Sequence, residues 1–157
     1  MTSQPTPAEL RELLLAGARA DGNPSVKAAV HLLLFTEMPQ APRFRQHVRI
    51  DHVRTLAYGL VHCAQVTDWR ELADDHELYP SGAELKFLNL AASFAVLDQP
   101  VNLYTEVTSG LDSAHARRLA EAVLIATGAA GYLAVTPVSQ DQPGVLFDPA
   151  SGQFETL

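Results

Sequence analysis

The most constraining feature of this sequence is the stretch from Ser81 to Gly128, in which residue types mark the starts and ends of two helices. Ser81 followed by Glu84 is a capping box, in which each side chain accepts a hydrogen bond from the other residue's backbone N–H. Asp112 begins a second helix, and Gly128 ends it because glycine tolerates left-handed dihedral angles. The pattern predicts helices over residues 81–97 and 113–127 within a packed helical core.

Two further helices are predicted near the N-terminus. Thr6, Pro7 and Glu9 place a cap residue, a proline and a glutamate at the positions that favour a helix start. Leucines then recur at helical spacing, which predicts a helix from Pro7 to Ala20. The next helix, Ser25 to Thr36, is apolar on nearly every side apart from one lysine and one histidine, so we expect it in the centre of the core.

The middle of the chain is ambiguous. From Arg43 to Asp51, polar and apolar residues alternate with the period of a strand, although a helical interpretation of the same segment stays open. Beyond it, apolar residues at helical spacing predict a helix from Asp51 or His52 to Gln65. Gly59 weakens that helix by about 1 kcal/mol relative to alanine. Asp68 and Glu71 predict the start of a short helix that continues through Leu72.

After Gly128 the pattern changes from helical to extended. A strand is expected around Tyr132, and residues 145–155 predict a hairpin with a loop of about five residues. The fold class expected is α+β: a predominantly helical single globular domain over residues 1–157, with a small antiparallel sheet that includes the C-terminal β-hairpin. Residues 1–5 are expected to be a flexible tail.

Composition limits the classes of function. Apolar residues make up 47% of the 157 residues and charged residues 18%, as in a globular protein. Cys63 is the only cysteine, and no signal-like or membrane-spanning segment is present, so we expect a cytoplasmic protein. The nine arginines against two lysines hint at a bacterial genome. The net charge of −7 disfavours binding to nucleic acid or to an anionic membrane.

A cluster of cations gives the sharpest binding signal. If residues 43–51 form a strand, Arg45, His47 and Arg49 project on one side about 7 Å apart, which suits a phosphate group or an acidic partner surface. A charged edge strand that prevents aggregation explains the same pattern. The candidate binding residues are Arg43, Arg45, His47, Arg49 and Arg54.

Metal binding is the alternative. His47, His52, Asp75 and His76 supply suitable ligand types, but their spacing matches no familiar metal motif. Cys63 lies on an apolar stripe and is expected to be a small core residue. Asp112, Ser113 and His115 are explained by a helix cap, since neighbours on one turn cannot form a catalytic triad. No cofactor motif is present, and nothing in the sequence supports a catalytic activity.

Two hypotheses follow. The first is a small, non-catalytic cytoplasmic protein that binds another macromolecule, as a regulator, an adaptor or a chaperone-like module. Its partner is expected to be a protein, and an exposed sheet edge allows two copies to pair as a homodimer. The alternative is a metal-dependent small-molecule-binding protein or hydrolase that uses the His47/His52/Asp75/His76 region.

Overall fold

The computed structural model describes residues 4–78, 81–96, 98–102, 105–106, 110–129, 145–148 and 153–156, the last two segments in backbone only. Helices α1 (Pro7–Asp21), α2 (Pro24–Leu33), α4 (Gly82–Ala95) and α6 (Ser113–Ala126) form the helical part. Two 3₁₀ turns, η1 (Met38–Gln40) and η2 (Pro42–His47), lead into strands β1 (Val48–Thr55) and β2 (Gly59–Val66), and the short helix α3 (Trp69–Asp74) follows. The molecule is therefore mixed helix and strand, as expected.

The ends of the helices follow the predicted caps. Thr6 forms the complete capping box: its hydroxyl accepts from the Glu9 N–H at 3.2 Å, and the Glu9 carboxylate accepts from the Thr6 N–H at 2.7 Å. At Ser81 only half of the box forms. The serine accepts from the Glu84 N–H, but the Glu84 carboxylate accepts from the N–H of Glu37 instead. The second half of that prediction is wrong, because the Glu84 side chain joins α4 to the start of the 3₁₀ turn η1.

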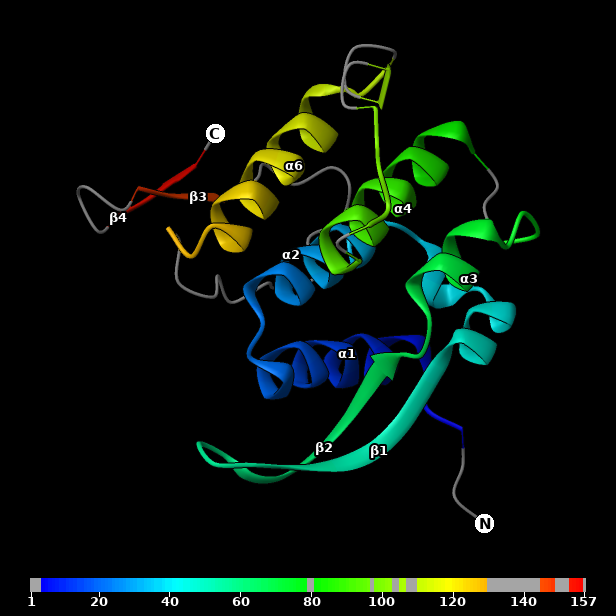
Figure 1. The fold of residues 1–157 in the computed structure, drawn as a ribbon, viewed down its shortest axis with the longest axis vertical. Helices are drawn as coiled ribbons and strands as arrows, with labels where there is room; N and C mark the ends of the chain where they lie inside the picture. Colours follow the sequence, from blue (N-terminus) through cyan, green and yellow to red (C-terminus); the bar gives the residue numbers. More distant parts are fainter. Residues whose placement is uncertain are drawn as a thin grey trace.

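The four helices enclose one hydrophobic core. Helix α2 lies between α4 and α6 and contacts both, and α1 packs beside α2 (Figure 1). Helix α2 is central, as its nearly uniform apolar surface predicted. The largest fully buried apolar side chains are Leu10, Leu14, Leu32, Leu33, Met38, Phe44, Leu72, Phe87, Leu88 and Leu90.

Strands β1 and β2 pair antiparallel into a two-stranded ribbon that runs along α1, with its turn extending past the helix (Figure 1). The helix predicted from residue 51 or 52 to residue 65 is therefore wrong. Gly59, which only weakened a helix in the sequence analysis, has φ = 69° and forms the end of the turn. The register pairs His52 with His62, and Val53 with Val61. The apolar residues have helical spacing, but the spacing did not decide the structure. The β-branched residues among them, Val53 and Val61, favour a strand.

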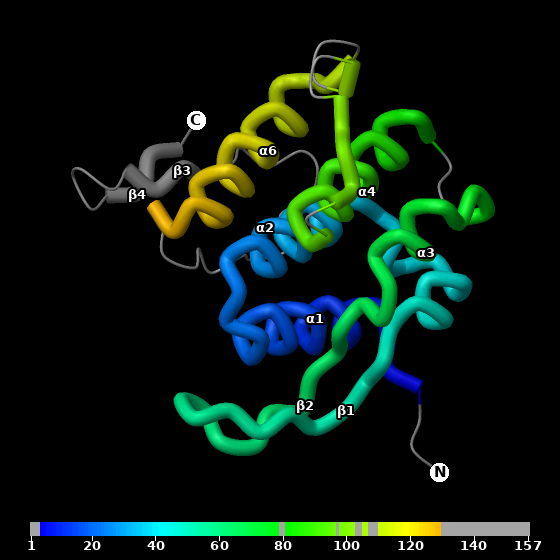
Figure 2. The backbone as a smooth tube through the Cα atoms, viewed as in Figure 1, coloured from blue at the N-terminus to red at the C-terminus, as the bar shows by residue number. Residues whose placement is uncertain are grey.

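The strand predicted from residue 43 is also wrong in its first half. Residues 42–47 form the 3₁₀ turn η2, and β1 begins only at Val48. Phe44 and His47 lie three residues apart, so both point to the same side of a 3₁₀ turn and both are buried. Figure 2 follows the chain from α2 through the two turns and into the ribbon.

Near the C-terminus, β3 (Val145–Asp148) and β4 (Gln153–Thr156) pair antiparallel, with Val145 opposite Thr156. The connection between them, and the expected strand at Tyr132, lie outside the described residues. The expected hairpin is therefore not placed against the helices.

Candidate functional site

The distal half of the ribbon exposes large apolar side chains. Leu56 and Tyr58 at the turn, and Leu60 at the start of β2, are 109%, 68% and 64% exposed. The turn is locally ordered, because the Thr55 hydroxyl accepts a hydrogen bond from the Tyr58 N–H at 2.9 Å. A defined turn that carries three exposed apolar side chains is unusual on a monomer surface and typical of a binding surface.

A groove of about 1170 Å³ lies between the first half of α1 and the middle of β1. Ala8, Leu13, Ala16 and Ile50 contribute apolar walls. The groove is also lined by three acidic residues, Glu9, Glu12 and Asp51, and by His52 and His62, whose rings stack at 4.5 Å between centroids.

Helix α1 touches the ribbon mainly at β2. A Cβ on Gly17 would lie 2.0 Å from the backbone oxygen of Ala64, so the helix backbone rests directly on that strand. Cys63, the neighbour of Ala64, is buried as predicted, but on a strand and not near the end of a helix. Burial raises the pKa of its thiol, which makes Cys63 a poor nucleophile.

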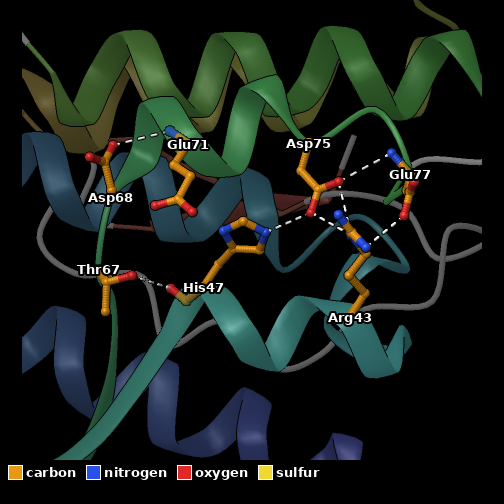
Figure 3. Close-up of polar contacts among 7 residues, drawn as sticks. All are labelled: Arg43, His47, Thr67, Asp68, Glu71, Asp75 and Glu77. Atoms are coloured by element: carbon orange, nitrogen blue, oxygen red, sulfur yellow. Dashed lines mark hydrogen bonds and ion pairs between the residues drawn. The ribbon is translucent and has the colours of Figure 1, made fainter.

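A polar network fastens the base of the ribbon. The Asp75 carboxylate accepts from Arg43 Nε at 2.7 Å and from His47 Nε2 at 2.8 Å, and Arg43 also pairs with Glu77 at 2.6 Å (Figure 3). The hydrogen bond from Arg43, followed by that from His47, lowers the pKa of Asp75 to about 2. The Thr67 N–H and hydroxyl both donate to the His47 carbonyl, at 2.9 and 3.1 Å, and so close the ribbon where β1 begins and β2 ends.

This network holds η2 against the loop after α3. Among the residues that the structure describes, Asp75 is the only side chain hydrogen-bonded to the His47 ring. The histidine–aspartate contact, whose two side chains are 7% and 8% exposed, ties η2 to the residue that follows α3. The segment that it positions is the one from which the ribbon emerges.

Asp75→Asn should lower the free energy of unfolding by about 1–3 kcal/mol, because His47 is buried and loses a charged acceptor. The folded pKa lies near 2 and below the ordinary 3.8, so the carboxylate stabilises the fold above about pH 4. That contribution is lost as pH falls from about 4 toward 2. Urea unfolding at pH 7, 4 and 2.5 measures the difference between wild type and variant. Asp74→Asn, at the exposed neighbouring position, is the control and should change little; equal effects at both positions would contradict the assignment.

The candidate binding residues do not lie on one face. Arg43 and His47 belong to the network above, and Arg45 donates to the Gln4 side chain at 3.1 Å and to the Pro5 carbonyl. Arg49 and Arg54 are exposed on β1 but five positions apart, so they point to opposite faces of the ribbon. Over the fully described residues 43–54, no single row of cations forms.

The four proposed metal ligands are only partly brought together. His47 meets Asp75, whereas His52 stacks on His62 in the groove, and His76 is exposed after α3. Across the part of the chain that the structure describes, no three histidine, cysteine, aspartate or glutamate side chains are placed to hold a metal ion. The capped helix start predicted at Asp112 is confirmed: Asp112 accepts from the backbone N–H of His115 at 2.9 Å and from its ring at 2.8 Å.

Sequence analysis missed a buried cluster between α2 and α6. His31 Nε2 lies 2.6 Å from Glu121 Oε2, Arg118 reaches the same oxygen at 3.1 Å, and all three side chains are buried. Burial lowers the pKa of His31, and the hydrogen bond to Glu121 only partly opposes this, so the neutral imidazole donates to the carboxylate. The Arg118 guanidinium lies 5.0 Å from the centre of the Phe35 ring. The only sequence signal was a histidine within an otherwise apolar helix.

Comparison with known proteins yields no relative. No family model, no curated protein and no solved structure matches this chain. Within the described residues, no helix combines the length and the apolar character needed to cross a membrane.

Proposed function

We propose that this protein is a non-catalytic module that binds a protein partner through the β1–β2 ribbon, and that it acts as a regulator, an adaptor or a chaperone-like module. The observation that carries the proposal is the exposure of Leu56, Tyr58 and Leu60 at the end of the ribbon. Burying one such side chain contributes about 1.5–3 kcal/mol, which is the size of the contribution that a binding hot spot makes.

The architecture of the ribbon supports the same proposal. Two-stranded hairpins are marginally stable alone, and here only the base is fastened, by α1 and by the Asp75 network. In the described residues β1 and β2 pair with each other and with no further strand, so both outer edges present backbone donors and acceptors. Strand addition to such an edge is a common form of protein recognition.

A cytoplasmic location is part of the proposal. Its support is the single cysteine, which is buried and whose thiol pKa is raised by burial, as suits a thiol that stays reduced. The net charge of −7 supports a protein partner over nucleic acid.

A photo-crosslinking amino acid at Tyr58 tests the proposal in cells that produce the protein. The matched control is the same substitution at Val123, an exposed apolar position on α6 that is 46% exposed. We expect position 58 to give a discrete adduct that position 123 does not give. The adduct protein, identified by mass spectrometry and purified, should bind wild type and lose tenfold or more in affinity for Leu56→Ser/Leu60→Ser.

The double variant should unfold at the wild-type denaturant midpoint, because both side chains are exposed, so lost binding would not reflect lost folding. Equal adducts from both positions, or unchanged affinity of the double variant, would refute the ribbon as the binding surface.

A further inference from the structure

We propose that the occupant of the free β1 edge is a second copy of this chain, so that two β1 strands pair antiparallel across a twofold axis through Ile50. This inference rests on the proposed function and names one partner for it. The resulting sheet has the order β2-β1-β1-β2. An isologous contact of this kind closes on itself and forms a dimer.

The twofold axis restricts the register. When two copies of one strand pair antiparallel about an axis perpendicular to the sheet, the axis passes through one residue, and that residue lies opposite itself. Its neighbours on either side then lie opposite each other, with Cβ atoms about 4.5–5.5 Å apart. The choice of central residue thus decides every cross-strand pair.

An axis at Ile50 makes the edge self-complementary. Ile50, which is 40% exposed, packs on its own copy. Arg49 lies opposite Asp51 of the second copy, and the symmetry repeats this ion pair on the other side of the axis. Both residues are exposed on β1. The Asp51 carboxylate also accepts a hydrogen bond from the His52 N–H at 2.7 Å, which the added strand must share or replace. Opposite charges in direct cross-strand positions stabilise a sheet.

The neighbouring registers lack this complementarity. An axis at Asp51 places two carboxylates face to face, which is destabilising. An axis at His52 places Ile50 opposite Arg54 and leaves Asp51 opposite a valine. Of these three registers, only the one centred on Ile50 pairs opposite charges.

The groove provides the space for the added strand. Ile50 and His52 alternate on the face of β1 that also lines the groove, together with Ala8, Leu13 and Ala16 of α1. In the proposed register the second copy presents its own Ile50 and His52 on that same face. The isoleucine of the second copy then lies beside the apolar residues of α1. The apolar part of the groove therefore suits this strand.

A charge-exchange series tests the pairing. Analytical ultracentrifugation of the purified full chain should show a dimer at micromolar concentration. Arg49→Asp and Asp51→Arg, each alone, should weaken the dimer tenfold or more, and the double variant should recover it, because the ion pairs re-form with reversed polarity. Arg54→Asp makes the same charge change on the same strand outside the proposed pairs, and should leave the dimer intact. A monomeric wild type, or a double variant no better than the single variants, would overturn the proposal.

A covalent test reads the register directly. Ile50→Cys in a Cys63→Ala background should form an intermolecular disulfide under mild oxidation, since the two Cβ atoms face each other across the axis. Arg54→Cys in the same background should not. The reverse result would refute the register.

The two proposals fail separately. If Tyr58 crosslinks to a different protein while the purified chain stays monomeric, the ribbon is a binding surface and the self-pairing is wrong. If the chain dimerises as proposed but Leu56→Ser/Leu60→Ser does not weaken binding of the crosslinked protein, the β1 edge is the dimer interface. The turn is then not a binding site for another protein.

Discussion

Glu121→Ala should lower the free energy of unfolding by about 3–5 kcal/mol, a large share of the stability of a domain of this size. Glu121 is 1% exposed and accepts hydrogen bonds from both His31 and Arg118. Removing its carboxylate leaves the Arg118 guanidinium, itself 6% exposed, as a buried charge without its partner. Removing one partner of a buried ion pair costs far more stability than the intact pair contributes. The remaining charge is then both desolvated and unpaired.

Equilibrium unfolding in urea measures this effect, with Glu12→Ala as the control. Glu12 is exposed on α1, so its removal should change the free energy of unfolding by less than about 0.5 kcal/mol. A triple variant, His31→Leu/Arg118→Met/Glu121→Leu, removes all the buried polar groups together and should recover most of the loss. A triple variant as unstable as Glu121→Ala would show that the cost is one of packing and not of an unpaired charge.

The helices were predictable because their signals are local. Thr6 with Glu9, Asp68 and Asp112 each form the cap bonds that their sequence positions indicated. A cap depends on residues within one turn, so no knowledge of the rest of the chain is needed. The Glu84 carboxylate does not accept the expected hydrogen bond from the Ser81 N–H. It accepts one from the N–H of Glu37, 47 positions away in the sequence.

The ribbon could not be predicted in the same way. Its residues satisfy helical spacing and strand alternation together, and the choice between them depends on α1, whose Gly17 lies against Ala64. Tertiary packing of this kind overrides local preference. Gly59, which has a positive φ, was the one local signal for a turn, but the sequence analysis treated it only as a residue that weakens a helix.

The polar clusters were hidden for a related reason. His47 was singled out from the sequence as a binding residue or a metal ligand, and Asp75 as a metal ligand. Their pairing was not foreseen, because it spans 28 positions, and that of Asp75 with Arg43 spans 32. The buried group of His31, Arg118 and Glu121 spans 90 positions and joins two helices, α2 and α6. Charged residues in a sequence indicate exposure by default, so partners that allow burial become visible only in the fold.

Gly17→Ala should lower the free energy of unfolding by about 1–3 kcal/mol or more, although it adds a single methyl group. The new Cβ would lie 2.0 Å from the carbonyl oxygen of Ala64 and 3.0 Å from its carbon. The obstacle is backbone and not the end of a flexible side chain, so either α1 or β2 must move. Overpacking of this kind costs about 1–3 kcal/mol, and more where the backbone cannot yield.

Gly82→Ala is the matched control for Gly17→Ala, because it makes the same change in a helix with nothing within 4 Å of the new Cβ. It should be neutral or stabilising by up to about 1 kcal/mol. Since Gly17 seats the ribbon on α1, Gly17→Ala should also weaken the dimer, whereas Gly82→Ala should not. Thermal unfolding and ultracentrifugation measure the two effects on the same samples. If Gly17→Ala matched Gly82→Ala in both, the close contact between α1 and β2 would not exist, and the groove that this contact shapes beside β1 would lose its basis.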